Sequence, residues 1–367
     1  MGNRSLVIPT AARRVLYVAY SLLPVSNESC GGAEQMLSTV EAEMAARGHI
    51  TTVAACAGSR ASGAVFATGH EPIDVDHFAE RNAEHEAQIL ELLRSTSSTR
   101  PAFDLIHDKS GSFWRRASEC NVPVLATLHL PRHFYPSDAF QDIPRNAYFN
   151  CVSDVQRQSF TDIPNLLTVV RNGIQVSDFP FKPVKEDYLL WMGRICEEKA
   201  PHLAIEVAHR NGLPLVLAGQ VYPFSYHQTY YNARIRPHLG NNISFFETPT
   251  MEKKTRLLAS ARALLVPSLV DETSSLVAME AMACGTPVIG FRRGAIPEVV
   301  IDRVTGFVVN DVGEMAEVVQ NTPEINPRTC RLHVETNHSA ARMAAEYEEL
   351  YERVLTVEAH RAGAKAA

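Results

Sequence analysis

The sequence predicts an α/β protein with two domains, each built on a parallel sheet. The chain has 367 residues, and at about 150 residues per domain this length favours two domains. Short apolar runs alternate with helical patterns along the whole chain, which is typical of β-α-β units. The alternation pauses after residue 170 and restarts at residue 188, which indicates two sheets in tandem.

The first half of the chain carries strand-like runs separated by helical patterns. Helices are expected over 32–47, ending at Arg47-Gly48, and over 82–94. Residues 57–80 are only weakly patterned, and no strand is assigned there. Strands are expected over 15–20, 50–55, 103–107, 123–129, 147–151 and 167–170.

The second half repeats this organisation. Residues 171–187 contain Asn-Gly, two prolines and several charges, so they are the predicted linker. Residues 339–358 are rich in Ala and Glu and are predicted to form a final helix. Strands are expected over 188–192, 213–218, 243–246, 263–267, 287–290 and 306–309, and helices over 200–211, 251–260 and 275–284. Such sheets bind ligands at the carboxyl ends of their strands, here in the cleft between the domains.

Composition excludes several classes of protein. The net charge of −6 argues against a nucleic-acid-binding protein, which would need a basic surface. No apolar run reaches the roughly 18 residues of a membrane span, and the N-terminus lacks the apolar region of a signal peptide. Seven scattered cysteines without a Cys-x-x-Cys pair are typical of a reduced, cytoplasmic protein.

The most informative segment is 271–287. Helix-forming residues 276–284 are followed by Gly285, which suits the left-handed position after a helix, and then by Pro287. Thr273, Ser274 or Ser275 could cap the helix start. The preceding strand would therefore deliver Glu272 to a helix N-terminus, where free N–H groups favour a phosphate or a developing negative charge.

Glu272 and Glu280 are eight residues apart, which is about 12 Å if the span is helical. The acid and base of a glycoside hydrolase lie roughly 5–9.5 Å apart, so these two carboxylates do not suit one glycosidic bond. They suit two ends of an elongated, hydroxyl-bearing ligand. The alternative is a capped surface helix with two solvated Glu side chains.

This segment resembles the family 4 retaining glycosyltransferases of the GT-B fold, which belong to the glycosyl transferases group 1. The likeness includes the Glu272 to Glu280 spacing, the following Ala-Met-Ala-Cys-Gly-Thr-Pro-Val-Ile, and residues 294–300 and 305–309. Residues 191–199, Trp-Met-Gly-Arg-Ile-Cys-Glu-Glu-Lys, are similar to the family's phosphate-binding segment. The first half matches more thinly, through residues 31–34, 127–129, 152–153 and 171–173.

The resemblance implies a domain organisation and an activity. Residues 1–178 would form an acceptor-side Rossmann-like domain, 179–338 a domain that binds the nucleotide sugar, and 339–367 a helix crossing back to the first domain. The two sheets would face each other across a cleft. The enzyme would transfer a hexosyl unit from a nucleotide diphosphate sugar, with a UDP-sugar as first choice, to an acceptor hydroxyl, and would retain the anomeric configuration.

The acceptor could be a glycan, a lipid or a small molecule. The resemblance implies no metal and no further cofactor, and an internal-return mechanism in which the leaving phosphate serves as base. A cytoplasmic enzyme is expected, with contact to the inner membrane face left open. The alternatives are a sugar-nucleotide epimerase of the same fold and a non-catalytic protein that binds nucleotide sugars.

The resemblance and simple electrostatics together suggest roles for individual residues. Arg194 and Lys199 would neutralise the diphosphate, although a surface pair beside two Glu residues is the alternative. Glu272 would hold the hexose, Glu280 the ribose, and His129 would lie near the reacting sugar. The catalytic candidates are thus His129, Arg194, Lys199 and Glu272, and the donor-binding candidates are Gly31, Gly32, Gly193, Arg194, Lys199, Gly219, Thr273, Ser274, Ser275, Leu276 and Glu280.

Three features qualify this picture. Family members commonly carry a small residue, an aromatic and a Gly after the first Glu, whereas this chain has Thr273, Ser274 and Ser275, so its sugar pocket should differ.

Residues 109–116 mix aromatic and basic side chains and could contact an acceptor or a membrane, although a solvated helix start is favoured. No histidine shows metal-ligand spacing, including His107, His133, His202, His209, His227 and His238.

Overall fold

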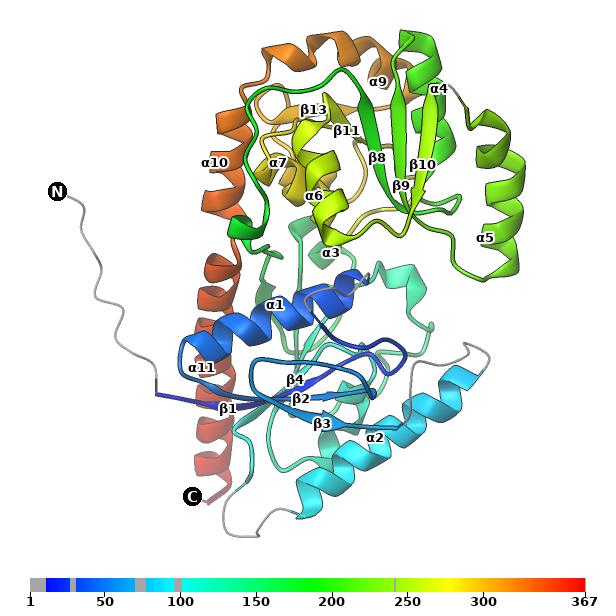
Figure 1. Cartoon of the computed structure of the whole chain (residues 1–367). Coiled ribbons are helices and arrows are strands. Elements are labelled where there is room, and N and C mark those ends of the chain that lie inside the picture. Colours follow the sequence, from blue (N-terminus) through cyan, green and yellow to red (C-terminus); the bar gives the residue numbers. More distant parts are fainter. Residues whose placement is uncertain (1–10, 27–30, 70–76, 96–100, 241, 367) are drawn as a thin grey trace, which may run out of the picture.

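The computed structural model describes residues 11–26, 31–69, 77–95, 101–240 and 242–366. The chain forms two α/β domains, one above the other in Figure 1, with the last helix running along the side of the lower one. Each domain contains one sheet in which all strand pairs are parallel. This arrangement confirms the predicted fold class.

The first domain contains a seven-stranded sheet in the order β3-β2-β1-β4-β5-β6-β7. Its strands are short and largely buried, because helices cover both faces of a parallel sheet. They are β1 (Arg14–Val18), β2 (Ile50–Ala55), β3 (Ala64–Ala67), β4 (Leu105–Asp108), β5 (Val124–Thr127), β6 (Ala147–Cys151) and β7 (Leu166–Val169).

The second domain contains a six-stranded sheet in the order β10-β9-β8-β11-β12-β13. The order reverses direction between β8 and β11, and such a switch point opens a crevice at the carboxyl ends of the strands. The strands are β8 (Leu189–Arg194), β9 (Leu215–Gln220), β10 (Ile243–Glu247), β11 (Ala263–Val266), β12 (Val288–Phe291) and β13 (Gly306–Val309).

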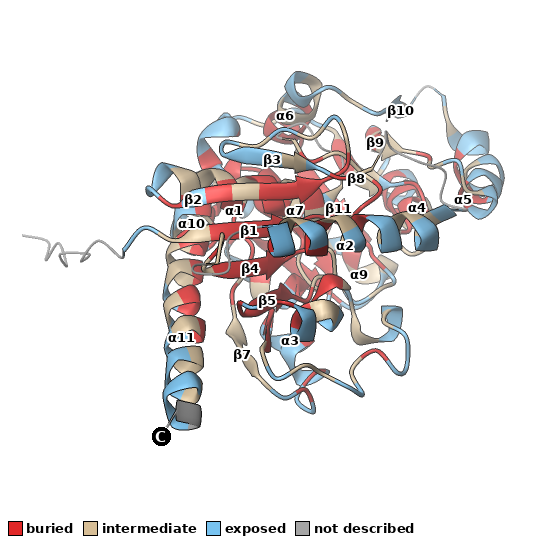
Figure 2. Cartoon of the chain, turned by 90° about the horizontal axis from the view of Figure 1, so that it is seen from below, coloured by how far each residue is buried: buried red, intermediate tan, exposed pale blue. Residues whose placement is uncertain are grey.

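Helices pack on both sheets and turn their polar sides outward, as the pale blue outer surfaces in Figure 2 show. Those of the first domain are α1 (Gly32–Ala46), α2 (Phe78–Ser95), α3 (Asp154–Gln158) and the 3-10 helices η2 (Phe113–Glu119) and η3 (Arg132–Phe134). Those that follow are α4 (Pro201–Asn211), α5 (Ser225–Tyr230), α6 (Met251–Ser260), α7 (Leu276–Ala283), α8 (Ile296–Val299), α9 (Val312–Val318), α10 (Pro327–Asn337) and α11 (Ala340–Ala366).

The chain crosses between the domains twice, and the two crossing segments lie side by side. The N–H of Ile174 donates to the His338 carbonyl at 2.9 Å, and the N–H of Ala340 donates to the Ile174 carbonyl at 2.9 Å. A Cβ atom on Gly173 would lie 2.3 Å from the Ser339 carbonyl oxygen, so this approach requires glycine. The crossing explains the presence of Gly173 in a segment singled out by the resemblance.

Helix α11 belongs to the core of the first domain. Met343, Tyr347, Leu350, Tyr351 and Val354 are buried in one cluster with strands β1, β2 and β4 and with helix α1. The C-terminal segment therefore completes the domain that the N-terminus begins. The boundary predicted at residues 178–179 lies between β7 and β8.

Several elements differ from the prediction, among them helices α5, α8 and α9, which were not predicted. Strand β3 lies in the weakly patterned region, and its four residues are mostly exposed, so it lacks an apolar signature. Helix α10 was not predicted, and α11 extends to Ala366 instead of ending at residue 358. Among the described residues, no helix combines the length and apolar character needed to cross a membrane.

Candidate functional site

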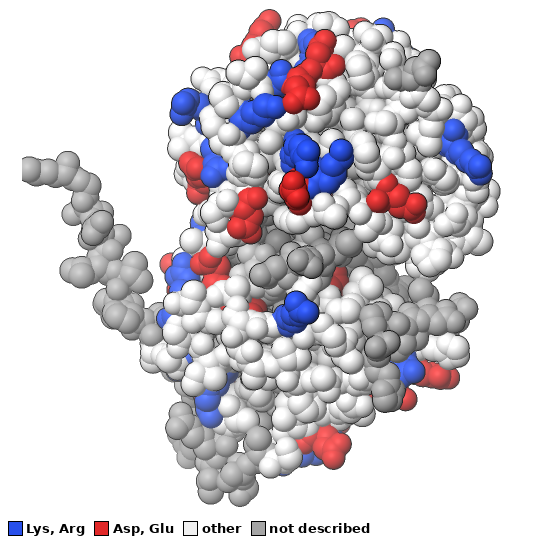
Figure 3. Space-filling view, in the orientation of Figure 1, with Lys and Arg blue, Asp and Glu red and all other residues white. Residues whose placement is uncertain are grey.

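The strand ends of the two domains border a cavity of about 490 Å³. Glu197 and Glu198 follow β8, and residues 269–271 follow β11, whereas His133 and Phe134 come from the first domain. On the side of the molecule shown in Figure 3, basic and acidic side chains are interspersed over both domains. Positive charge for an anionic ligand must therefore come from individual residues at the cleft.

Glu272 is held by two donors at its place after β11. The Lys199 ammonium lies 2.6 Å from Oε1, and the Ser268 hydroxyl donates to the same oxygen at 2.5 Å. The Glu272 side chain is 10% exposed. Since both contacts use Oε1, the second carboxylate oxygen is left for a hydroxyl of a ligand.

The backbone of Glu272 is supported by the loop before α8. The N–H of Ala295 donates to the Glu272 carbonyl at 2.6 Å. Gly294 has φ of +50°, and a Cβ there would lie 2.2 Å from the same carbonyl oxygen. This loop approaches so closely that it sets the position of Glu272, which gives Gly294 a role that the sequence did not show.

Glu280 lies on α7 and pairs with Lys254 on α6. Their Oε1 and Nζ atoms are 2.5 Å apart, and the side chains are 6% and 15% exposed. A nearly buried carboxylate needs such a partner, because leaving water is costly for an unpaired charge. Lys254 therefore orients Glu280, and sequence reasoning missed this residue.

Arg194 and Lys199 lie at the carboxyl end of β8, as predicted, but their surroundings differ. Arg194 is exposed, and within the described residues its guanidinium makes no ion pair. Lys199 is 27% exposed and is already paired with Glu272. The structure thus brings Lys199 to the first Glu and leaves Arg194 available at the cleft.

The predicted side-chain cap of α7 does not form. The helix begins at Leu276 after Ser275, whose hydroxyl makes no capping hydrogen bond. Ser274 Oγ is buried and has no hydrogen-bond partner among the described residues. Thr273 instead donates to the His129 carbonyl at 2.7 Å, which joins the two domains. Helix α7 therefore begins without a side-chain cap.

The glycine candidates divide into two groups. Gly31 and Gly32 open α1 as predicted, and a Cβ on Gly32 would lie 3.4 Å from Leu276, so the N-termini of α1 and α7 meet. A Cβ on Gly219 would lie 1.8 Å from the Gly193 carbonyl oxygen, where β8 and β9 pair. Gly219 is therefore required by strand packing, whatever its role toward a donor.

His129 follows β5 and is near Lys109. Burial, and to a lesser extent the Lys109 charge, lowers the pKa of His129 well below its usual value. Its Nε2 atom has no hydrogen-bond partner among the described residues. The imidazole is therefore neutral at pH 7 and can donate or accept one hydrogen bond at the cleft.

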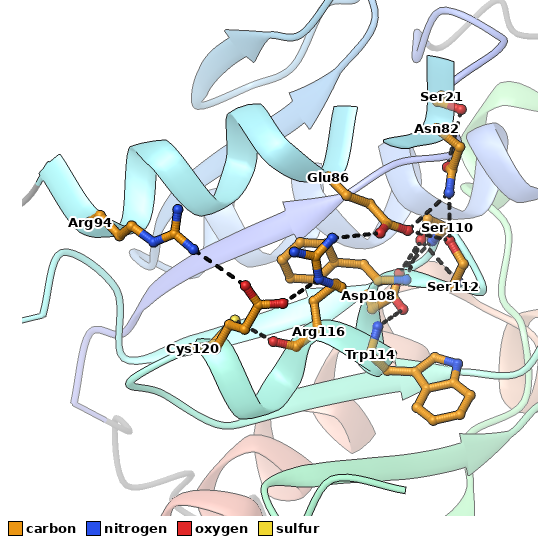
Figure 4. Close-up of polar contacts among 12 residues, drawn as sticks. Ser21, Asn82, Glu86, Arg94, Asp108, Ser110, Ser112, Trp114, Arg116 and Cys120 are labelled. Atoms are coloured by element: carbon orange, nitrogen blue, oxygen red, sulfur yellow. Dashed lines mark hydrogen bonds and ion pairs between the residues drawn. The ribbon is translucent and has the colours of Figure 1, made fainter. Parts of the chain in front are cut away.

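Residues 109–116 are less exposed than a solvated helix start would be, since Lys109, Phe113 and Trp114 are buried. Figure 4 shows the polar contacts that Asp108, Ser110, Ser112 and Trp114 make there. Phe113 and Trp114 are buried in the core, so they do not present an aromatic surface to a membrane or an acceptor. The Trp114 backbone N–H donates to Asp108 at 2.9 Å, and the Lys109 ammonium donates to the Tyr347 hydroxyl at 3.0 Å. This segment supports the first sheet.

Three further side chains meet although their sequence spacing gives no hint of it. Cys196 and Glu198 follow β8, His227 lies on α5, and one ligand atom from each lies within 4.8 Å of the others. His227 was excluded as a ligand because its neighbours in sequence carry no partner. Only the return of α5 toward the β8 loop brings the three together.

Comparisons with known proteins agree with this geometry. Residues 176–324 match the glycosyl transferases group 1 family. A D-inositol 3-phosphate glycosyltransferase of Mycolicibacterium smegmatis is 29% identical over 150 residues, which cover 40% of this chain and 34% of that protein. The chain thus aligns with about a third of the length of this curated relative.

Solved structures share the whole fold. Sucrose-phosphate synthase from Thermosynechococcus elongatus has a TM-score of 0.79 at 18% identity, covering 94% of this chain and 100% of that one. Anabaena Alr3699/HepE in complex with UDP-glucose has a TM-score of 0.74 at 17% identity, covering 93% and 100%. Residues 176–324 therefore form a glycosyl transferases group 1 domain, within a chain that has the GT-B arrangement of two parallel-sheet domains.

Proposed function

We propose that this protein is a retaining glycosyltransferase that moves a hexosyl unit from a nucleotide diphosphate sugar, with UDP-glucose as the first donor to test, to an acceptor hydroxyl. The observation that carries this proposal is the contact between Thr273 and His129. It brings the residue after Glu272 against the strand end of the other domain, so candidate groups from both domains border one site. The structure of the Anabaena protein, a structural neighbour at 17% identity, was solved with UDP-glucose, which supports this choice of donor.

The roles follow from charge and position. Arg194, Lys199 and the N–H groups at the start of α7 would stabilise the departing diphosphate, because preorganised donors stabilise charge that develops in a transition state. Glu272 would accept hydroxyl hydrogen bonds from the hexose through Oε2. Glu280, oriented by Lys254, would accept those of the ribose.

Lys199 would have to serve two anions. In the described structure its ammonium contacts Glu272 at 2.6 Å, and a diphosphate would enter beside this pair. Lysine offers three donors, so it can hold a carboxylate and a phosphate oxygen together. The pair would thereby link the binding of the hexose to the binding of the leaving group.

The neutral His129 would donate a hydrogen bond to the reacting sugar, and the leaving phosphate would accept the proton of the acceptor. Glu197 and Asp271 line the cavity, and their negative charges disfavour an anionic acceptor. We therefore expect a neutral, hydroxyl-rich acceptor, either a glycan or a small polyol. A phosphorylated acceptor such as the one in the name of the mycobacterial relatives fits this cavity less well.

The test is the double variant Arg194→Ala, Lys199→Ala, assayed with a panel of nucleotide sugars and neutral acceptors. Removal of two charges from the leaving group should lower kcat/KM by about 10³-fold. Arg210→Ala is the matched control, because Arg210 is exposed on α4 and its ion pair among the described residues is with Glu206 of the same helix. If kcat/KM of the double variant stays within tenfold of that of the unaltered protein, the assignment of Arg194 and Lys199 to the diphosphate is wrong. If the unaltered protein epimerises the donor in the absence of acceptor, it is a sugar-nucleotide epimerase. If it binds the donor but never turns it over, it is a non-catalytic binding protein.

A further inference from the structure

A small cluster of metal-binding side chains lies beside the cleft. Sγ of Cys196, a carboxylate oxygen of Glu198 and a ring nitrogen of His227 all lie within 4.8 Å of one another. Cys196 and Glu198 belong to the loop after β8, and His227 belongs to α5. The cluster thus joins two elements that are not neighbours in sequence.

Two of the three side chains carry buried polar atoms without partners, whereas the Cys196 thiol donates to the Arg194 carbonyl at 3.5 Å. His227 is fully buried, and neither of its ring nitrogens has a hydrogen-bond partner among the described residues. Oε2 of Glu198 is likewise buried and unpartnered in that part of the chain. Nearly all buried polar groups in proteins are hydrogen-bonded, and each unsatisfied one costs roughly 1–3 kcal/mol. Unpartnered atoms therefore occur on two of three side chains whose ligand atoms lie within 4.8 Å of one another, and this combination indicates a missing ligand.

The chemistry of the donors selects the ligand. Thiolate, imidazole and carboxylate are the three protein groups that bind Zn²⁺. With bonds of about 2.0–2.3 Å, the ligand atoms around tetrahedral zinc lie roughly 3.3–3.7 Å apart. The ligand atoms, which lie within 4.8 Å of one another, would therefore have to move together by up to about 1.5 Å to reach this geometry. A thiolate and a carboxylate also balance the charge of the dication, so the complex can stay buried without a net charge.

The surroundings suit a tightly held ion. The rings of Tyr222, Phe224 and Tyr226 lie 6.0, 5.3 and 4.3 Å from the His227 ring. Such an apolar shell limits solvent access and strengthens metal–ligand bonds. Glu198 and Tyr226 also line the cavity of about 490 Å³, so the site borders the cleft.

We propose that Cys196, Glu198 and His227 bind a zinc ion through three protein ligands, with the fourth position left to water or a ligand in the cavity. The three ligands are not among the residues proposed to bind the donor, although Cys196 and Glu198 lie between Arg194 and Lys199 in the chain. The proposal departs from the expectation that the protein needs no metal. The ion would tie α5 to the loop that carries Arg194 and Lys199. Its presence does not depend on the proposed glycosyl transfer.

The test measures metal binding on the full, untagged chain. Protein treated with chelator is dialysed against zinc, and bound zinc is counted by plasma mass spectrometry. Replacement with Co²⁺ gives a second readout, since a cysteine thiolate bound to cobalt produces an intense near-ultraviolet charge-transfer band. We expect about one zinc per chain, and a cobalt spectrum with this band and the visible bands of a tetrahedral ion.

The variants separate the site from other thiols and histidines. Cys196→Ser should abolish the thiolate band, and His227→Gln should weaken zinc binding at least about 100-fold. Cys120→Ser and His209→Gln are matched controls, because neither residue belongs to the cluster, and both should bind like the unaltered chain. Less than a tenth of an equivalent of zinc, or no thiolate band with cobalt, overturns the proposal without any variant. Unchanged binding by folded Cys196→Ser also overturns it.

Discussion

Two histidines, one in each domain, are fully buried but differ in their hydrogen bonds. In the first domain, His107 Nδ1 lies 2.6 Å from the Tyr351 hydroxyl, and Nε2 lies 2.8 Å from the Thr127 hydroxyl. In the second domain, His227 has no partner for either nitrogen among the described residues. Both side chains are 0% exposed. Burial alone therefore says little about function, and the state of the hydrogen bonds separates a structural imidazole from a candidate ligand.

The same difference extends to the neighbours of each histidine. Around His107, Thr127 also contacts Asn150 and Tyr347, so the polar atoms under the first sheet form one connected network. In the second domain the polar groups at the strand ends include charged side chains in small clusters, such as Lys199 and Ser268 around Oε1 of Glu272. The polar groups around His107 are thus satisfied without a ligand, whereas His129 Nε2 in the same domain and both ring nitrogens of His227 in the second have no partner among the described residues.

The largest expected effect is a difference in the free energy of unfolding when the same substitution is made at each of the two histidines. His107→Leu should lower the free energy of unfolding by on the order of 3 kcal/mol, because it leaves the Tyr351 and Thr127 hydroxyls buried without their partner. His227→Leu should leave it unchanged or raise it in chelator-treated buffer, since no hydrogen bond is lost and two buried, unpartnered nitrogens are removed. Urea unfolding compares them, and equal losses would contradict the distinction.

Asp108, which follows His107 on β4, should make the stability of the first domain depend on pH. Burial raises the pKa of Asp108 to about 6, although hydrogen bonds from Ser110 and Trp114 oppose the shift. The folded state then binds this proton more tightly than the unfolded state does. Stability contributed by this group is present below about pH 4 and is lost as the pH rises to 6.

The corresponding measurement is urea unfolding of the unaltered chain and of Asp108→Asn between pH 4 and pH 7. The stability of the variant relative to the unaltered chain should rise by on the order of 2 kcal/mol over this range. Other titrating groups are common to both proteins and cancel in the difference. A constant difference at every pH would show that Asp108 keeps an ordinary pKa.

Glu280 tests the other side of the comparison, where ligand binding should suffer. Glu280→Gln should weaken binding of the free nucleotide diphosphate by about tenfold, because the ribose loses a charged acceptor. Glu272→Gln should weaken it less, since Glu272 is assigned to the hexose. Calorimetry with UDP distinguishes the two, and the reverse order would exchange their assignments.

The smallest expected effect concerns the contact between the domains. Thr273→Val removes the hydroxyl that donates to His129 and should lower kcat/KM about threefold to fivefold, close to 1 kcal/mol. Thr273→Ser keeps the hydroxyl and is the matched control. If both variants behave alike, the contact does not contribute to assembling the site.

The sequence predicts the fold well, because apolar runs and helical periodicity mark buried elements directly. Strand β3 was not predicted because an exposed edge strand needs no apolar alternation. The aromatic side chains of Phe113 and Trp114 suggested a surface, but both are buried. A single sequence does not show which way such residues face in an irregular segment.

The sequence predicted only those parts of the candidate site that depend on the local residue pattern. Gly31 and Gly32 open a helix, and Gly285 has φ of +79° after α7, as glycine preferences indicate. The pairing of Lys254 with Glu280 joins residues 26 apart on two helices, and no periodicity reveals it. The Ser275 cap was wrong because α7 starts without a side-chain hydrogen bond. Contacts between elements decide these details.

The crossing of the last helix has a consequence for biosynthesis. The ribosome makes the strands of the first sheet early, yet Tyr347, Tyr351 and Val354 cover part of its core. Domains that are continuous in sequence can fold while translation proceeds. Here the N-terminal domain must wait with an uncovered apolar face until the entire second domain has been synthesised. Ribosome-bound chains that stop before α11 should therefore depend on chaperones more than chains that include it.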